Sequence, residues 1–219
     1  MTNVIDGKRV LGPPQDIREV KNAYEAYDQT MKLDPYNIKD LLKAHKLMMA
    51  GLVREAGTFR SGNVGVYAGT QLIHMGSPAN YVPELMNPLF DWLKETKYHT
   101  LVKSCIFHYE FVFIHPFADG NGRTVRLWQT LILTKWKTFF AWLPVETLVH
   151  EYQDEYYQAI QLSNNAGESS IFAEFMLRMI RDALKELVEN QKSGRIVRHG
   201  AAKNGYWEVC PASGSVSGS

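Results

Sequence analysis

The chain has 219 residues, of which 45% are hydrophobic, so it is long enough for one domain with a complete core. Its 24 basic and 23 acidic residues give a net charge of +1, which excludes the broad basic surface typical of proteins that bind nucleic acid or anionic membranes. Cys105 and Cys210 are too few for a disulfide framework or a zinc site. The sequence shows no leader pattern and no apolar stretch of membrane length, so we expect a cytoplasmic protein, although export as an effector by a leaderless route would give the same pattern.

The apolar residues in the first half of the chain predict helices rather than an alternation of strands and helices. Asn37 is a typical N-cap, and the apolar side chains that follow it at helical spacing predict a helix that ends by residue 57. Pro83 can open the next helix, whose inward face would be formed by Leu85, Met86, Leu89, Phe90 and Leu93. Residues 101–113 are apolar on nearly every side, which predicts a central buried helix.

The second half of the chain continues the helical pattern. Residues 127–136 are again apolar, Pro144 opens a helical segment that contains Tyr152 and Tyr156, and Ser169 or Ser170 caps an apolar stripe that runs to residue 188. Residues 58–82 differ, because Gly, Ser and Asn mixed with β-branched residues predict a short β-hairpin. We therefore expect an all-α bundle around a central buried helix, as one domain over residues 1–190, with a disordered tail over residues 191–219.

A dense cluster of reactive and phosphate-binding side chains lies at residues 113–126, with the sequence FIHPFADGNGRTVR, between two apolar segments. Gly120, Asn121 and Gly122 precede the second segment, so their backbone N–H groups are candidates for the unpaired donors at a helix N-terminus. That end of a helix carries a positive dipole and binds phosphate. The two glycines would let an anion approach the backbone closely.

The charged residues around this turn suit phosphate chemistry. Arg123 and Arg126 are three residues apart, so we expect them to project to the same side and to clamp phosphate oxygens. Asp119 is placed to hold Mg²⁺ together with the phosphates of a substrate. His115, with an ordinary pKa of about 6.5, is suited to take a proton from a hydroxyl. Each feature alone is common in structural roles, but together they predict transfer of a phosphate-containing group to a hydroxyl.

The sequence HPFADGNGRTVR, residues 115–126, resembles the signature of the Fic family, HxFx(D/E)GNGRxxR, at every specified position. The resemblance extends through GKRVLGPP at residues 7–14, AGTFR at residues 56–60 and EYYQAIQLSNNAG at residues 155–167. It implies a Fic-type helical bundle. It also implies a protein adenylyltransferase that moves AMP from ATP to a Tyr, Thr or Ser hydroxyl of a target protein, whose identity the sequence does not give.

The resemblance also implies roles for single residues. His115 would be the general base, Asp119 would hold Mg²⁺, and Phe117 would anchor the active-site loop, residues 115–122, in the core. Contacts to the nucleotide would come from Gly120, Asn121, Gly122, Arg123, Arg126, Tyr157 and Asn164. For Tyr157 and Asn164 the sequence supports a core tyrosine and a surface asparagine nearly as well as the walls of an adenosine pocket.

The predicted hairpin at about residues 58–82 would be the flap that docks the target, through Gln71, Leu72, Ile73 and His74. Adding a strand of the target to this hairpin would fix the acceptor hydroxyl for attack. We expect His74 to lie on the flap surface rather than to act as a second catalytic group.

Three other polar residues have open roles at this stage. We expect His108 to be a core histidine bonded to backbone, with support of His115 as the weaker alternative, and His45 to lie in the core or at its edge. Arg60 either positions the flap or is solvated.

Many Fic proteins carry an inhibitory helix with the pattern (S/T)xxxE(G/N), whose Glu pairs with the last Arg of the signature, here Arg126. No segment matches this pattern fully; the partial matches are Thr147 with Glu151, Ser170 with Glu174, and Thr2 with Asp6. We therefore expect that the inhibitor is absent from this chain, either because an N-terminal inhibitory helix is missing or because a separate partner supplies it. Arg126 would then have no internal carboxylate partner.

Two kinds of alternative function remain. The same fold could transfer UMP, phosphate or phosphocholine, or could remove AMP. Gly122 argues against the kinase-like Doc branch, which has Lys at this position, and removal of AMP is associated with the inhibitory Glu. The other alternative is a catalytically silent nucleotide-binding regulatory module. The sequence leaves open whether the chain forms a homodimer.

Overall fold

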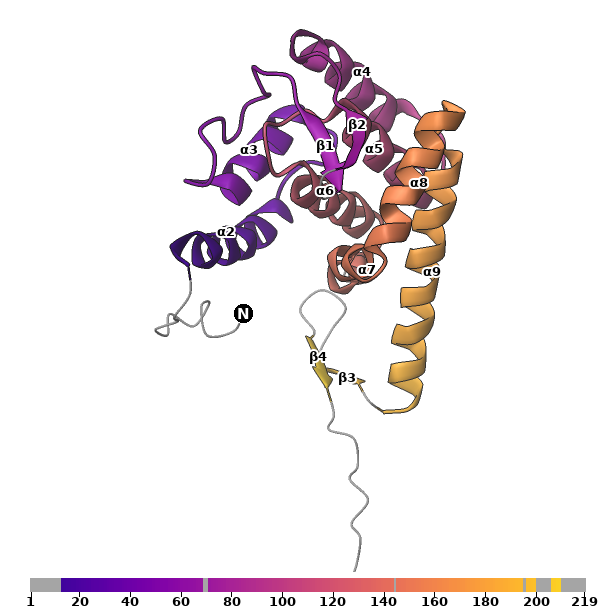
Figure 1. Ribbon diagram of the computed structural model, residues 1–219. Helices are drawn as coiled ribbons and strands as arrows, with labels where there is room; N and C mark the ends of the chain where they lie inside the picture. Colours follow the sequence, from indigo (N-terminus) through magenta and orange to yellow (C-terminus); the bar gives the residue numbers. More distant parts are fainter. Residues whose placement is uncertain (1–12, 69–70, 144, 195, 200–205, 210–219) are drawn as a thin grey trace, which may run out of the picture.

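The computed structural model describes residues 13–68, 71–143, 145–194, 196–199 and 206–209. Pro144, Cys210, the partial match at residues 2–6 and most of the stretch at residues 7–14 lie outside these ranges. Helices make up most of the described chain, which confirms the all-α prediction. They pack as one bundle, with a small hairpin on one side of it and a second hairpin beyond its far end (Figure 1).

The centre of the bundle is the helix pair α5 (Thr100–Ile114) and α6 (Asn121–Trp136). Nine side chains of α5 are buried, on all sides of the helix, as its largely apolar sequence predicts. Burial of each large apolar side chain, such as Phe107 or Phe111, contributes about 1.5–3 kcal/mol to folding. Helix α6 begins six residues before the apolar run at residue 127, so its first turns are formed by the polar end of the signature.

Helix α2 (Pro14–Thr30) was not predicted, because its sequence is polar and only Ala26 and Thr30 are buried in it. It packs against α3 (Ile38–Met49), which is capped by the Asn37 side chain accepting from the Lys39 N–H at 2.9 Å, as predicted. Polar side chains of α2 satisfy the carbonyl groups just after α3. The Asn22 amide donates to the Ala50 carbonyl at 2.8 Å and Arg18 to the Gly51 carbonyl at 3.0 Å.

The remaining helices agree with the predicted pattern except at two points. They are η1 (Ala79–Tyr81), α4 (Val82–Glu95), η2 (Thr138–Trp142), α7 (Val145–Glu151), α8 (Gln153–Ala166) and α9 (Ser170–Lys192). Leu85 was expected inside but is 40% exposed. The single helix expected after residue 144 is divided into α7 and α8, because Tyr152 departs from helical backbone angles. Ser169 is the N-cap residue of α9, although its side chain makes no capping hydrogen bond.

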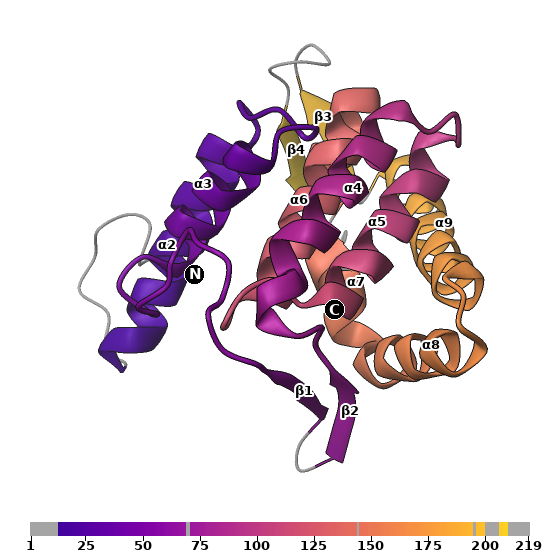
Figure 2. The ribbon, with the colours of Figure 1, turned by 90° about the horizontal axis from the view of Figure 1, so that it is seen from above.

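Two antiparallel hairpins complete the fold. Strands β1 (Gly65–Ala68) and β2 (Gln71–Met75) form the predicted hairpin, with Gly65 opposite Met75 and an irregularity after Val66. Figure 2 shows it projecting from the bundle, where β2 contacts α8. Strands β3 (Ile196–His199) and β4 (Tyr206–Val209) pair in the tail, so the prediction of disorder is wrong for these residues. Their β-branched and aromatic residues favour strands.

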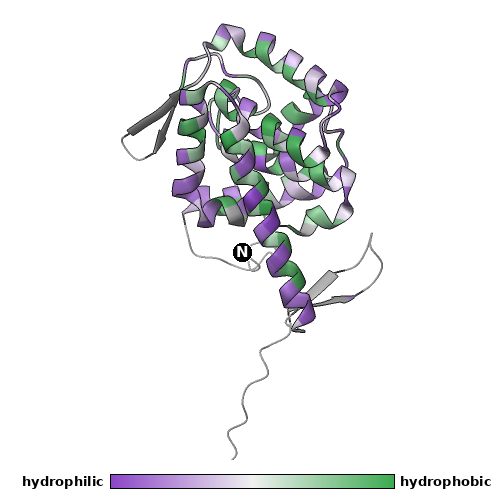
Figure 3. Ribbon diagram, turned by 90° about the vertical axis from the view of Figure 1, so that its right-hand side faces the viewer, coloured by the Kyte–Doolittle hydropathy of each residue, from purple (hydrophilic) through white to green (hydrophobic). Residues whose placement is uncertain are grey.

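Figure 3 shows hydrophilic and hydrophobic residues mixed along the helices on the side of the bundle in view. Helix α9 is the longest, and its C-terminal turns extend past the bundle toward β3 (Figures 1 and 3). Within the described ranges, no helix combines the length and the apolar character needed to cross a membrane.

Candidate active site

His115 follows the last residue of the central helix α5 and has a left-handed backbone conformation, with φ 55° and ψ 63°. Of the non-glycine residues that the structure describes, it alone has a positive φ. This conformation costs a non-glycine residue on the order of 1 kcal/mol, so its surroundings must hold it in place. Its backbone N–H donates to the Phe111 carbonyl at 2.9 Å, which caps α5.

Side chains from α3 and α6 fix the loop that follows. Phe117 is fully buried and stacks on the His45 ring, with the ring centroids 3.7 Å apart. Asn121 forms two hydrogen bonds with the Phe117 backbone, accepting from its N–H at 2.8 Å and donating to its carbonyl at 2.7 Å. The Asn121 side chain therefore shapes the loop, a role that the sequence analysis did not include.

His45 is more than the core residue that was expected. Its Nδ1 accepts from the Gly57 N–H at 2.9 Å, so its Nε2 carries the proton and donates to the Asp119 carbonyl at 3.0 Å. Burial lowers the pKa of His45 to about 4, which keeps the ring neutral and this arrangement intact at neutral pH. His45 thus ties the active-site loop to α3.

Gly120 turns the chain into α6 in a left-handed conformation, with φ 77°. This backbone conformation favours glycine, and a Cβ atom at this position would lie 2.5 Å from Sδ of Met49 and displace that side chain. The Gly120 carbonyl accepts the first hydrogen bond of the helix, from Thr124. The N–H groups of the preceding turn, residues 121–123, have no acceptor within the helix and form the positive end of its dipole.

Gly122 keeps the space between this N-terminus and Arg126 clear. A Cβ atom at residue 122 would lie 3.0 Å from Nη1 of Arg126. The first turn of α6 therefore lies directly beside a guanidinium group. Backbone donors and a guanidinium facing the same space are the groups that bind phosphate oxygens.

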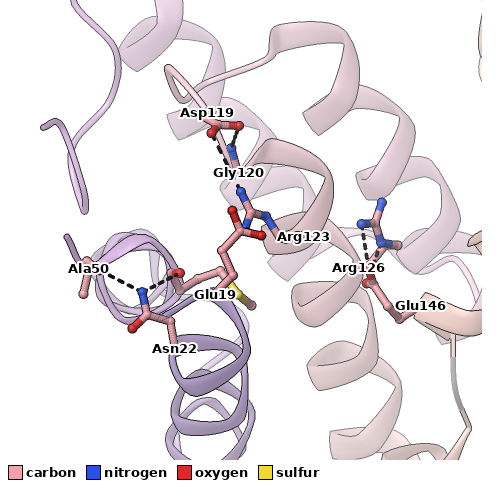
Figure 4. Close-up of polar contacts among 9 residues, drawn as sticks. Glu19, Asn22, Ala50, Asp119, Gly120, Arg123, Arg126 and Glu146 are labelled. Atoms are coloured by element: carbon pink, nitrogen blue, oxygen red, sulfur yellow. Dashed lines mark hydrogen bonds and ion pairs between the residues drawn. The ribbon is translucent and has the colours of Figure 1, made fainter. Parts of the chain in front are cut away.

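Arg126 is paired with Glu146 at the start of α7, which contradicts the prediction that it has no internal carboxylate partner. Its Nε donates to one carboxylate oxygen at 2.5 Å and its Nη2 to the other at 2.7 Å (Figure 4). Burial alone would lower the pKa of Arg126, but the hydrogen bonds and charge of Glu146 raise it. The sequence pattern missed this pair because Glu146 is not part of an (S/T)xxxE(G/N) segment.

Arg123 is held by different carboxylates. Its Nη1 lies 3.2 Å from Oε2 of Glu19 in α2, and its Nη2 lies 3.8 Å from Oδ2 of Asp119. Figure 4 shows Arg123 turned toward α2 and Arg126 turned toward Glu146, so the expected clamp of two arginines on the same side is not formed in this state. The pairing partners, rather than the spacing of three residues, set the directions of these two side chains.

Asp119 fits the part of a magnesium ligand when phosphate supplies the other oxygens. Its side chain is 63% exposed, and its Oδ1 accepts from the Gly120 N–H at 2.6 Å. Across the described ranges, no three His, Cys, Asp or Glu side chains come together as a metal site. One exposed carboxylate beside an anion site suits Mg²⁺, which commonly binds one or two carboxylates plus substrate phosphates and water.

The two residues predicted for an adenosine pocket, Tyr157 and Asn164, both lie on α8, two helical turns apart on one face. Tyr157 is partly buried against the core, and Asn164 accepts a hydrogen bond from the Tyr109 hydroxyl of α5 at 2.8 Å. The structure thus anchors this face of α8 to the central helix.

His108 is fully buried, and its imidazole forms hydrogen bonds with two side chains. The predicted hydrogen bond to backbone is therefore wrong. Its Nδ1 donates to the Gln129 amide oxygen at 2.7 Å, and its Nε2 accepts from the Tyr156 hydroxyl at 3.0 Å. Burial lowers its pKa to about 3. The three side chains join α5, α6 and α8 in the core.

The flap residues Gln71, Leu72, Ile73 and His74 form most of β2, as predicted. Their backbone places them beside the site, since Gly76, which follows the strand, packs against His115: a Cβ atom there would lie 3.1 Å from Cβ of His115. Arg60 lies at the base of the flap and is 3% exposed, so the solvated alternative is wrong.

The fold and the site together define a helical domain in which a short loop leads from His115, at the end of α5, to the glycine-flanked N-terminus of α6. Residues 32–133 match the Fic/DOC family. A solved structure of a Fic family protein from Desulfovibrio desulfuricans G20 is 54% identical, with a TM-score of 0.83, covering 86% of this chain and 58% of that chain.

Curated relatives agree with this match. The chain is 31% identical to protein adenylyltransferase fic-1 of Caenorhabditis elegans and 29% identical to protein adenylyltransferase Fic of Aedes aegypti, over 78% of its length in each case. It spans about a third of each of those proteins, 32% and 33%. The chain therefore carries a Fic/DOC family domain, and the resemblance predicted from the signature is confirmed.

Proposed function

We propose that this Fic domain transfers AMP from ATP to a Tyr, Thr or Ser hydroxyl of a target protein. The observation that carries the proposal is the position of His115, which packs against Gly76 at the base of the flap and begins the loop that leads into the N-terminus of α6. The names of the curated relatives support the same activity. A base next to an anion site is the arrangement required for attack of a hydroxyl on phosphorus.

In the proposed reaction, His115 takes the proton of the acceptor hydroxyl. The hydroxyl oxygen forms a bond to the α-phosphorus of ATP, while the bond from that phosphorus to the bridging oxygen breaks and pyrophosphate leaves with the electron pair. The N–H groups at the start of α6 stabilise the charge on the phosphate oxygens. Arg123 and Arg126 bind the outer phosphates after exchanging their carboxylate partners for them.

The other residues position the substrates. Asp119 would hold Mg²⁺ with the phosphates, and the ion would supply positive charge next to the leaving pyrophosphate. Tyr157 and Asn164 face the adenosine. Residues 71–74 of β2 pair with the backbone of the target, which brings its hydroxyl toward His115.

A catalytically silent nucleotide-binding module is the second candidate, and one observation favours it. Both arginines of the signature are paired with internal carboxylates, Glu19 and Glu146, so the phosphate site is occupied by the chain's own side chains. Such a domain would bind ATP weakly and transfer nothing.

The test is to incubate the purified chain with α-labelled ATP and Mg²⁺, with and without cell lysate, and to compare wild type, His115→Ala and Glu146→Gln. Label that appears with wild type or Glu146→Gln and is lost in His115→Ala supports the adenylyltransferase. ATP binding without any transfer, even in Glu146→Gln, supports the silent module. Competition by unlabelled UTP or CDP-choline tests the other donors, and transfer of label from γ-labelled ATP tests phosphorylation. Release of label from a target that carries labelled AMP tests removal of AMP.

The remaining expectations belong to the same proposal. We place the protein in the cytoplasm and the catalytic unit within residues 1–190. A separate inhibitory partner or a further N-terminal inhibitory helix would act in addition to Glu146. Analytical ultracentrifugation of the labelled and unlabelled chain decides whether it acts as a homodimer.

A further inference from the structure

The guanidinium of Arg60 is buried and makes an unusual set of contacts. Its Nε donates to the His115 carbonyl at 2.7 Å and its Nη1 to the Gly62 carbonyl at 2.7 Å. Its Nη2 donates to the Ile114 carbonyl at 3.3 Å and also to the Ser77 carbonyl. All four acceptors are backbone carbonyl oxygens, so this side chain holds main chain rather than a charged partner.

The four carbonyls come from two parts of the site. Ile114 and His115 are at the C-terminus of α5, where unpaired carbonyls and the negative end of the helix dipole favour a cation. Gly62 precedes β1 and Ser77 follows β2, so they are the two ends of the flap. One guanidinium therefore connects both ends of the flap to the backbone of His115.

Backbone contacts reinforce this connection. The Arg60 N–H donates to the Pro116 carbonyl, and the Gly76 N–H donates to the Val64 carbonyl, both at 3.0 Å. A Cβ atom at Gly76 would lie 3.1 Å from both Nη2 of Arg60 and Cβ of His115. The base of the flap, the guanidinium and the histidine are thus packed so closely that a methyl group at Gly76 would require its neighbours to shift.

We propose that Arg60 is a positioning residue that couples the flap to His115. It holds the left-handed backbone of His115 by its carbonyl and keeps the flap ends at a fixed distance from the imidazole. A hydroxyl carried by a target strand on β2 then arrives within reach of the base. The inference rests on the proposed function for the roles of flap and base, whereas the mechanical coupling can be measured without any activity.

The phosphate half of the site provides a contrast. None of the Arg60 contacts described above involves α6, Arg123 or Arg126. Loss of Arg60 should therefore impair transfer to protein while leaving ATP affinity nearly unchanged.

The test uses Arg60→Met, which removes every donor while keeping a long side chain, and Arg60→Lys, which keeps the charge with fewer donors. Lys103→Met is the matched control, because Lys103 is also a buried cation that donates to a backbone carbonyl, Leu93 at 3.3 Å, but near the opposite end of α5. Hydrogen exchange of the amides of Gly76, His115 and Phe117 reports the coupling, and the amide of Phe172 in α9 reports the rest of the fold.

In Arg60→Met we expect exchange at the three site amides to become about tenfold faster together, with Phe172 unchanged. The ATP dissociation constant should stay within about twofold, while label transfer to lysate protein at saturating ATP falls about 100-fold. Arg60→Lys should give smaller changes in the same direction. If Arg60→Met does not fold, the exchange pattern of Arg60→Lys decides.

Two results would overturn the coupling. One is faster exchange at Gly76 while His115 and Phe117 stay protected. The other is a Lys103→Met variant that has the same unfolding temperature as Arg60→Met, the same loss of transfer and the same exchange pattern. Arg60 would then act only by stabilising the fold. A wild type that transfers no label would remove the proposed function, but the exchange results would still decide the coupling.

Discussion

Arg126 and Glu146 form a two-point ion pair, with Nε and Nη2 of the arginine each bonded to a different carboxylate oxygen. The arginine side chain is 17% exposed and the glutamate 46% exposed, so the pair is reached by solvent from the glutamate side. An incoming phosphate must compete with this carboxylate for the same donors. Arg126 thus has an internal carboxylate partner, but this partner lies on α7 and is not part of an (S/T)xxxE(G/N) segment.

Glu146→Gln should bind ATP more tightly than wild type, by about fivefold, because it removes a partly exposed ion pair that competes with phosphate. Isothermal titration calorimetry with ATP and Mg²⁺ measures this. Glu155→Gln is the matched control, since Glu155 forms an exposed ion pair with Arg178 away from the signature. Unchanged or weaker affinity in Glu146→Gln would mean that the glutamate orients Arg126 rather than competing for it.

Gly122→Ala should weaken ATP binding about tenfold, because a methyl group 3.0 Å from Nη1 of Arg126 narrows the space for phosphate. The unfolding temperature should change little. Gly62→Ala serves as the control, since a Cβ atom there has no heavy atom within 4 Å. Equal ATP affinity in wild type and Gly122→Ala would place the phosphates elsewhere.

Stability should fall as pH drops from 6.5 to about 4, in part because of His45. Its pKa is about 4 in the folded chain and 6.5 when unfolded, so the unfolded chain binds more protons in this window. This group contributes its full stabilisation above pH 6.5 and loses about 1.4 kcal/mol per pH unit within the window. Urea unfolding of wild type and His45→Gln at several pH values measures the difference, and parallel curves would contradict the assignment.

Tyr156→Phe should lower the free energy of unfolding by about 1–3 kcal/mol, because it leaves buried Nε2 of His108 without its donor. Thermal unfolding measures the effect. Tyr152→Phe, at the exposed junction of α7 and α8, should change stability by less than about 0.5 kcal/mol. A similar effect of the two substitutions would show that the hydrogen bond in the core contributes nothing.

The sequence predicted those features whose cause is local. The central helix α5 follows from a segment that is apolar on nearly every side, and the position of the active-site turn follows from a signature without gaps. Helix α2 was not predicted because only Ala26 and Thr30 are buried in it, and part of its packing depends on polar contacts such as the hydrogen bond from Asn22 to the Ala50 carbonyl just after α3.

The partners of the site residues could not be predicted, because they come from distant parts of the chain. Glu19 approaches Arg123 only after α2 packs beside α6. Arg60 likewise meets the His115 carbonyl across 55 positions of sequence. Spacing along one helix indicates which side chains can share a face, but not which carboxylate or carbonyl each will reach.

The dependence of the turn on its neighbours limits how it can be transplanted. Gly120 fits under Met49, Phe117 stacks on His45, and the His115 carbonyl is bonded to Arg60, yet none of these three partners lies within residues 115–126. Grafting the signature alone onto another pair of helices would reproduce its amino-acid sequence but not its backbone conformation. A designer who wanted this chemistry on a new scaffold would have to carry α3 and the base of the flap along with it.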